Sequence, residues 1–483
     1  MITDLERAFN AITKKQKLYT DLFNYYDGDQ PILYLTSQLR EIFRNIDINF
    51  VLNICSVVID ATKERINFHG FTSKDSTIND SLAKLVESQE LINEADETHE
   101  GALVTGEAYI IVWPEVVEGE PTGEVEIFYN DPRNVHMFYD AANPKQPRYA
   151  AKLWQSEDNL YHLTLYYPDR LEYYITQKSE DEAVKLEAKS FIPDISRSGV
   201  LIEGDSITWP ENPYDQIPVF HYQLGKRKTK SDLKNVTPLQ DGINKLLSDM
   251  IVTAEYMAGP QRYVISNADT SNLKNKIGGI WDLPAAEPGD QPTQAGQFDM
   301  AALENYLKSI DSLISYASSI TSTPKHYFDP STGAAPSGEA LIAMEAPLNK
   351  KVQDRIDKFT PVWKKVAAFA LKILNIEIDP VDITVNFAKP ETVQPRTSAE
   401  ITQIETQSGV PLAISLKRQG WTESELSELE KVRQAGDEKS KASLAVALLN
   451  YQRQFNSGNG NGNGNNPVNN PAAGDNGNAN SGQ

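Results

Sequence analysis

Two amphipathic segments of similar length, separated by about 40 residues, place the strongest constraint on the fold of this chain. Residues 238–258 follow Thr237 and carry Gln240 at the third helical position, which predicts a helix opened by a capping box. Pro238 at the first helical position favours the same start. One face of this helix is apolar: Leu239, Ile243, Leu246, Leu247, Met250, Ala254 and Met257.

Residues 300–320 predict a second helix with the same pattern. Its apolar face is Leu303, Leu307, Ile310, Leu313, Ile314, Ala317 and Ile320. The insert between the two helices, residues 259–299, contains strand-like pieces at 262–265 and 279–283 and then a run rich in Pro and Gly. Two helices of roughly 30 Å with a small module between their far ends predict a paired stalk that carries a tip.

The chain before this stalk, residues 1–237, mixes helices and strands. Helices are predicted at 3–25 and 80–96 from apolar residues at helical spacing. Short segments rich in Val, Ile, Tyr and Thr then predict antiparallel strands at 105–113, 125–129, 135–139, 149–154, 160–167 and 171–176. The predicted fold class is therefore α+β.

A long helix is predicted after the stalk, over residues 338–375. Ser337 is placed as its N-cap, and Pro347 and Pro361 lie inside it, where each removes a backbone hydrogen bond and is expected to kink the helix. A strand at 383–387 completes residues 338–396, and a small helical region follows at 397–455, with a capping box at 422–425. Residues 456–483 are mostly Asn and Gly and carry too little apolar mass to fold, so we expect them to be disordered.

Composition excludes several classes of protein. The 483 residues include 46 Lys and Arg against 67 Asp and Glu, a net charge of −21, which argues against a tight, general nucleic-acid binder but not against a protein past which DNA slides. A single cysteine, Cys55, rules out a disulfide framework and a Cys-rich zinc module. No apolar run approaches the roughly 20 residues of a membrane span, and the N-terminus lacks a signal peptide, so we expect a reducing, aqueous compartment.

No pattern for catalysis emerges. Gly225-Lys226 lacks the upstream glycine and the hydroxyl residue of a phosphate-binding loop, His99-Glu100 lacks the second histidine of a zinc protease, and no nucleophile elbow is present. Cys55 lies in an apolar stretch and is interpreted as a small buried side chain. We therefore expect no catalytic residue, no metal site and no cofactor.

One basic cluster leaves two interpretations open. It precedes the first stalk helix and comprises Lys226, Arg227, Lys228 and Lys230. It is either a solvated loop or a contact with phosphate or with an acidic neighbouring subunit.

The order of these pieces resembles the portal proteins of tailed bacteriophages, in the type found in phages with long, non-contractile tails. The resemblance rests on local matches from about residue 10 to 450: the helix end Leu22–Asp29 with its Tyr-Tyr-x-Gly, the strand start Gly106–Tyr109, and the loop-to-helix junction at Thr321–Phe328 and Pro336–Leu341. The Asn/Gly-rich tail lies outside the resemblance.

The resemblance implies a ring of about twelve subunits at one vertex of the capsid. Residues 1–237 and 338–396 would form the wing, 238–258 and 300–320 the stem, and 259–299 the clip. The tunnel loop would be 321–337, and the crown 397–455.

The resemblance also implies partners: double-stranded DNA in the channel, the terminase large subunit and then the head–tail adaptor at the clip, and the major capsid and scaffold proteins. The location would be the virion, and the host cytoplasm during assembly. Six residues are candidates for the DNA channel: Lys325, His326, Tyr327, Ser312, Ser315 and Ser319. Three are candidates for docking the motor or connector: Arg262, Trp281 and Asp282.

Other classes of protein remain open. An adaptor or baseplate component would also assemble, with another symmetry and without a channel as wide as DNA. A metal-dependent nuclease would bind Mg²⁺ through acidic residues, and divalent-dependent cleavage of DNA would reveal it. A monomeric binding module would require the long amphipathic helices to pack on one another.

Overall fold

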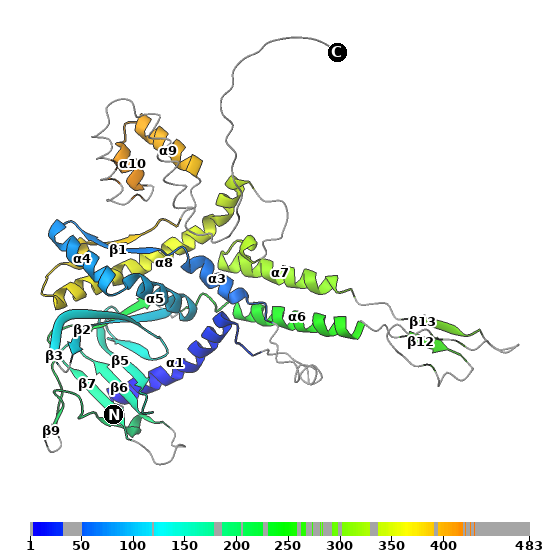
Figure 1. The fold of residues 1–483 in the computed structure, drawn as a ribbon. Helices are drawn as coiled ribbons and strands as arrows, with labels where there is room; N and C mark the ends of the chain where they lie inside the picture. The colour runs from blue at the N-terminus through cyan, green and yellow to red at the C-terminus, as the bar shows by residue number, and fades with distance from the viewer. Residues whose placement is uncertain are drawn as a thin grey trace, which may run out of the picture. The chain divides into compact units, whose positions relative to one another are not determined.

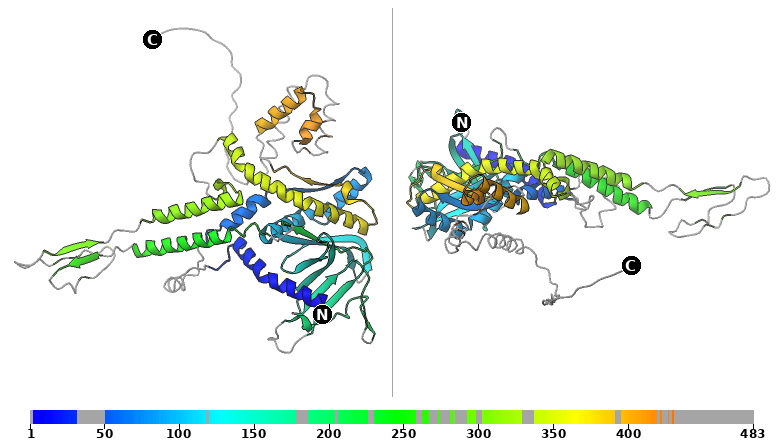
Figure 2. Two further views of the ribbon diagram at one scale, coloured as in Figure 1. Left: turned by 180° about the vertical axis from the view of Figure 1, so that it is seen from behind. Right: turned by 90° about the horizontal axis from the view of Figure 1, so that it is seen from above.

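The described residues of the computed structural model are 3–31, 51–117, 120–177, 186–203, 206–225, 230–257, 262–266, 273, 281, 283, 292–297, 302–328, 337–390, 395–418, 421, 426 and 429. The chain divides into two units, one ending at Thr392 and one starting at Val393. Helices and strands are mixed in the first unit (Figures 1 and 2), which confirms the α+β class.

Among the described residues, four helices come before strand β2 (Glu107–Val117): α1 (Asp4–Asp27), α3 (Ile54–Lys63), α4 (Ser76–Ser88) and α5 (Leu91–Thr105). Thr3 and Glu6 form a capping box at the start of α1, and Gly28 ends it with φ 85°, a conformation that glycine adopts without strain. The single helix predicted at 80–96 is wrong, because Glu90 takes a left-handed φ of 46° and separates α4 from α5.

The strands predicted before the stalk are confirmed and form antiparallel sheets. One sheet has the order β11-β2-β3, from Val219–Gln223, Glu107–Val117 and Glu120–Asn130. A second has the order β4-β5-β6-β7-β8, from Val135–Tyr139, Pro147–Gln155, Tyr161–Tyr166, Leu171–Thr176 and Phe191–Pro193. The 3₁₀ turn η1 (Ala188–Ser190) precedes β8, and a small hairpin of β9 (Leu201–Glu203) and β10 (Ser206–Thr208) follows.

The paired stalk helices are present as α6 (Thr237–Met257) and α7 (Glu304–Thr321), which lie side by side in Figure 1. The strand at 262–265 is confirmed as β12 (Arg262–Ile265). Its partner is β13 (Gln294–Gln297), which overlaps the end of the run rich in Pro and Gly, where no strand is predicted from the sequence. Of the strand predicted at 279–283, only Trp281 and Leu283 are described, and neither belongs to a strand.

The capping box predicted at the start of α6 is wrong, because Gln240 bonds a different partner. The Gln240 side chain is fully buried and does not turn back to the helix start. Its Oε1 accepts from Ile54 N at 2.7 Å, and its Nε2 donates to Leu52 O at 2.6 Å. Gln240 therefore joins the stalk helix to the start of α3.

The long helix α8 (Gly338–Ile373) follows η2 (Lys325–Tyr327) and continues through both internal prolines. Ser337 is its N-cap, as predicted, and accepts from Ala340 N. After η3 (Pro380–Asp382), the predicted strand is present as β14 (Ile383–Phe387) and pairs with β1 (Phe68–Ser73).

The second unit contributes α9 (Pro395–Gln407) and α10 (Leu412–Arg418), joined by an ion pair between Arg418 and Glu405 at 3.1 Å. The capping box at 422–425 and the tail at 456–483 lie outside the described residues.

The main core forms around α8. Trp363 and Phe359 are fully buried beneath α5, β1 and β11. Trp363 Nε1 donates to His99 Nε2 at 3.0 Å, and the His99 ring stacks on Phe359 with centroids 4.8 Å apart. Burial lowers the pKa of His99 to about 3. Cys55 is buried in the same core, as predicted, and burial raises its pKa to about 12.

A buried polar network fixes α1 on the sheets. Lys15 Nζ and Tyr19 OH both donate to Glu107 Oε1, at 2.6 and 2.8 Å, and His221 Nε2 lies 3.2 Å from Glu107 Oε2. Burial opposes the charge on Glu107, but the hydrogen bond from His221 and the charge of Lys15 prevail and lower its pKa. The Gly106–Tyr109 segment noted in the sequence therefore supplies a structural anchor.

His99 predicts an acid-dependent loss of stability. Its pKa of about 3 in the folded protein lies below the ordinary value of 6.5, so the unfolded chain binds the proton first. The stability that neutral His99 contributes is complete above pH 6.5, and it declines by about 1.4 kcal/mol per pH unit as the pH falls toward 3. His99→Gln retains an acceptor for Trp363 and cannot be protonated. We expect it to flatten the pH dependence of the denaturant midpoint between pH 4 and 7.

His69→Gln is the matched control, because His69 is exposed on β1. Equal slopes for the two variants would contradict the role assigned to His99.

Candidate functional site

The residues predicted for a DNA channel lie on α7 and on the η2 turn that follows it. The helix α7 packs on α6 through Ile310, Ile314 and Ala317, all buried. Gly242 on α6 allows close approach, because a Cβ there would lie 3.3 Å from Leu313. The opposite side of α7 is exposed.

The serines of α7 are bonded to their own helix. Ser312 Oγ donates to Lys308 O and Ser315 Oγ donates to Asp311 O, each at 2.9 Å. A hydroxyl whose hydrogen is used in this way presents only lone pairs outward, and phosphate oxygens are also acceptors. This surface therefore attracts a phosphate backbone weakly. Ser312 and Ser319 are exposed and Ser315 is half-buried.

Lys325 is paired with the stalk helix rather than isolated. Its Nζ lies 2.6 Å from Asp311 Oδ1, and its side chain is about one-third exposed. The turn is reached through Ser322, which ends α7 with φ 59°. The positive charge of Lys325 is thus largely balanced within the subunit, which limits its attraction for phosphate.

Tyr327 and His326 belong to a cluster around Arg65, at the end of α3. Arg65 Nη2 donates to Tyr327 OH at 2.6 Å and lies 3.1 Å from Glu345 Oε1 on α8. Arg65 Nη1 also donates to Asn349 Oδ1 and to Pro390 O. His326 Nε2 lies 3.8 Å from Glu345 Oε1. One nearly buried arginine therefore holds the η2 turn, α8 and the segment after β14 together.

The sequence carried no signal for Arg65 as a functional position. It lies 262 residues from Tyr327 and 280 from Glu345, and only the folded chain brings them together. Burial opposes its charge, but the hydrogen bonds and charges of Tyr327 and Glu345 prevail and raise the pKa of Arg65.

The two tyrosines of the Tyr-Tyr-x-Gly match also connect elements. Tyr25 OH donates to Asp241 Oδ1 on α6 at 2.8 Å. Tyr26 OH donates to Asp60 Oδ1 on α3 at 2.8 Å and to Glu100 Oε2 on α5 at 3.2 Å. Burial, followed by the hydrogen bond to Asp60, raises the pKa of Tyr26. The end of α1 is therefore hydrogen-bonded both to the stalk helix α6 and to the helices α3 and α5.

Two of the three docking candidates are brought together. The Arg262 guanidinium on β12 lies 5.7 Å from the centre of the Trp281 ring, within range of a cation–π contact. Asp282 lies outside the described residues.

Most of the basic cluster also lies outside the described residues, namely Lys226, Arg227 and Lys228. Lys230 is described and exposed. Gly106, at φ 96°, allows the backbone at Lys230 to pass closely, because a Cβ on Gly106 would lie 2.8 Å from that backbone.

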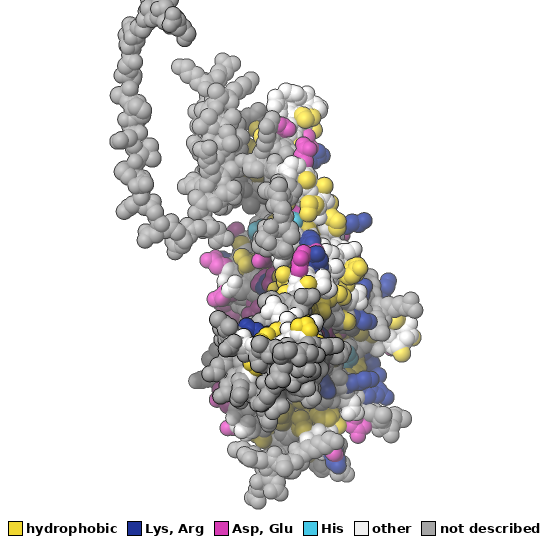
Figure 3. All heavy atoms as spheres, turned by 90° about the vertical axis from the view of Figure 1, so that its right-hand side faces the viewer, with side chains coloured by type: hydrophobic (Ala, Val, Ile, Leu, Met, Phe, Trp, Pro, Cys, Tyr) yellow, Lys and Arg dark blue, Asp and Glu magenta, His cyan; other side chains and the backbone are white. Residues whose placement is uncertain are grey.

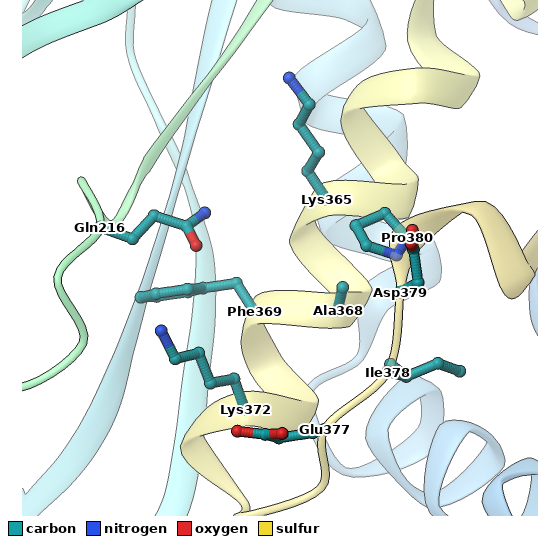
Figure 4. A pocket seen from close by; sticks show the side chains of 9 residues that line it. All are labelled: Gln216, Lys365, Ala368, Phe369, Lys372, Glu377, Ile378, Asp379 and Pro380. Carbon is teal, nitrogen blue, oxygen red and sulfur yellow. The ribbon is translucent and has the colours of Figure 1, made fainter.

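A pocket of about 420 Å³ lies beside the C-terminal half of α8. Figure 4 shows Lys365 and Lys372 on the helix, with Glu377 and Asp379 on the segment that follows. Lys372 Nζ donates to Tyr214 O at 2.6 Å. None of the predicted channel or docking residues lines this pocket.

No helix in the described part of the chain is both long and apolar enough to cross a membrane. No group of three or more His, Cys, Asp or Glu side chains there is arranged to hold a metal ion.

Comparison with known proteins identifies the class. The model of a protein family described as "Phage portal protein, SPP1 Gp6-like" matches residues 6–442, which is most of the chain. The chain therefore belongs to this family of phage portal proteins, as the sequence resemblance indicated.

Two curated relatives have the same designation. The portal protein of Mycobacterium phage D29 is 25% identical over 199 residues, covering 39% of this chain and 41% of the relative. The portal protein of Mycobacterium phage L5 is 26% identical over 184 residues, covering 36% of this chain and 38% of the relative. The chain thus aligns with about two-fifths of the length of these relatives.

Removal of Arg65 is expected to destabilise the junction. Arg65→Ala leaves the nearly buried Glu345 without its guanidinium partner, which typically costs about 3–5 kcal/mol. Tyr327→Phe removes only a hydroxyl that accepts from Arg65 and is expected to cost about 1 kcal/mol. Denaturant unfolding followed by tryptophan fluorescence measures both.

Arg148→Ala is the matched control, because Arg148 forms an exposed pair with Asp4. Its expected cost is less than about 1 kcal/mol. An Arg65 variant no less stable than this control would refute the role of Arg65.

Proposed function

We propose that this chain is the subunit of a ring of about twelve copies that forms the DNA channel at one vertex of a phage capsid. The single observation that carries the proposal is the family match from residue 6 to 442. The ring is a passive conduit in this proposal, and a separate ATPase drives the DNA.

The parts of the subunit are proposed to divide the work. Residues 1–237 and 338–396 form the wing, and α6 and α7 form the stem around the channel. The insert 259–299 is the clip, 321–337 the tunnel loop and 397–455 the crown. The paired α6 and α7, with a β12–β13 ribbon inserted between them in sequence, support this division.

Surface chemistry favours passage over binding. Each chain carries a net charge of −21, so a ring of many copies repels phosphate overall. The hydroxyls of Ser312 and Ser315 are satisfied by their own helix, and Lys325 is balanced by Asp311. Together with Ser319, His326 and Tyr327, these residues are proposed to border the DNA while giving it no strong grip.

The partners are proposed to act in sequence. The terminase large subunit docks on the clip during packaging, and the head–tail adaptor replaces it, while the wing contacts the major capsid and scaffold proteins. Assembly takes place in the host cytoplasm, and the finished ring is part of the virion. The family is structural, which accords with a protein that has no catalytic role of its own.

Shortening the tunnel loop tests the channel. The deletion lies between Phe328 and Ser337, so that the pairs of Lys325 and Tyr327 with Asp311 and Arg65 are kept. We expect rings to assemble as in the wild type, while packaging or retention of DNA in capsids falls severalfold.

The control removes the same number of residues from 178–185, between β7 and η1. Normal packaging by the loop variant would refute the role of the loop.

A substitution at Trp281 tests the docking surface. Trp281→Ala removes the ring beside Arg262 and is expected to weaken binding of the purified terminase large subunit by tenfold or more, as measured by surface plasmon resonance. Trp154→Ala, on β5, is the control. Equal affinity of wild type and Trp281→Ala would place the motor contact elsewhere.

A further inference from the structure

Two exposed helix surfaces of opposite charge have no role in the subunit described so far. The basic surface is Lys14, Lys17 and Leu18 on α1, and the acidic surface is Glu90, Ile92 and Glu97 at the start of α5. We propose that, in the ring, the basic surface of one copy of this chain binds the acidic surface of the next copy. The inference rests on the proposed ring and names the contact that closes it.

The basic surface is separate from the part of α1 that packs on the sheets. Lys15, on the inner side, is buried against Glu107, whereas Lys14 and Lys17 point outward and are exposed. Neither has an ion-pair partner within the described part of the chain. Leu18 on the same face of α1 is 58% exposed, so an apolar side chain adjoins the two charges.

The acidic surface has the complementary composition. Helix α5 contains no Lys or Arg, and its exposed side begins with Ile92, which is 56% exposed. Glu90 and Glu97 are exposed and form no ion pair with any described residue. Asp96, also exposed, is already paired with Lys63 at 3.1 Å and is left out of the proposed contact.

The two surfaces lie in different places on the subunit, so they do not neutralise each other within one chain. Lys15 and Tyr19 bind Glu107, just beyond the C-terminal end of α5. Ile92 is at the other end of that helix, about 20 Å away by the rise of an α-helix.

Ring symmetry calls for this kind of arrangement. A cyclic assembly brings two different surface patches of neighbouring copies together at every contact, unlike a twofold dimer. In the lower half of Figure 3, most Lys and Arg side chains gather toward the right edge and most Asp and Glu side chains toward the left edge.

Attraction between two such surfaces would also offset the electrostatic repulsion between copies of the chain. Copies that each carry a charge of −21 repel one another, and a local contact of opposite sign offsets this repulsion and fixes how neighbours align. Leu18 and Ile92, exposed on the same two helices, would add apolar contact area to such an interface.

Charge reversal tests the contact in the full-length protein. The variants are Lys14→Glu with Lys17→Glu, Glu90→Lys with Glu97→Lys, and all four together. Mass photometry measures the fraction of subunits in rings at about 0.1 M salt, where the Debye length is about 10 Å. We expect each double variant to need at least tenfold more protein to form rings, and the fourfold variant to recover the wild-type concentration.

Lys145→Glu with Lys189→Glu is the control, because both lysines are exposed elsewhere on the subunit. Circular dichroism of each variant separates a failure to fold from a failure to assemble. A second measurement uses Leu18→Cys with Ile92→Cys and a short bis-maleimide linker, since the native Cys55 is buried. We expect a ladder of linked copies only when both cysteines are present.

The outcomes separate the two proposals. If the wild type forms no ring even when the scaffold and capsid proteins are co-expressed, the proposed function fails. If the wild type forms rings and the double variants assemble as readily, or the fourfold variant does not recover, the contact is refuted. Absence of the linked ladder from assembled rings refutes it as well.

Discussion

The fold depends on the pairing of a late strand, β14, with an early one, β1. Strand β14 pairs with β1 across more than 300 residues, and α8 buries Trp363 and Phe359 in the core that α5 and β11 also form. Between these points the chain leaves through α6, forms the β12–β13 ribbon and comes back through α7. The residues before and after this insert share one hydrophobic core, so the insert itself does not need a large core.

Side-chain bonds at the base connect the insert to the rest of the first unit. Gln240 and Asp241 on α6 bind the start of α3 and the end of α1, and Arg65 binds the η2 turn that follows α7. Each tie is a hydrogen bond or ion pair at a nearly buried or half-buried site, where geometry is held more closely than at an exposed one. The proposed channel residues therefore lie next to a part of the fold that is held by several side-chain bonds. Their own exposed side chains offer only weak interactions to DNA.

The elements that could be predicted from the sequence are those that depend on local residue spacing. The strands from 105 to 176, the pair of long helices and the N-cap of α8 all follow from residue spacing that recurs within a few turns. The errors arose where tertiary contacts override local preference. Gln240 had the position of a capping residue, but a buried amide is better satisfied by the backbone of 52–54.

Long-range contacts explain what the sequence did not reveal. Strand β13 has the local composition of a loop, and its pairing with β12 defines it as a strand. Arg65 has no distinguishing neighbours, and its partners come from three elements far along the chain. The Tyr25-Tyr26 and Gly106-Glu107 segments were visible as resemblances, yet their physical roles became clear only when their partners were in view.

The proposed function requires this chain to assemble into a ring around a channel. The most direct measurement is the mass and symmetry of the purified protein, by mass photometry and negative-stain electron microscopy. The account predicts particles of about 650 kDa, for twelve copies of a 53.9 kDa chain, with rotational symmetry and a central hole as wide as a DNA duplex. Particles of one or two copies, persisting when the scaffold and capsid proteins are co-expressed, would contradict it.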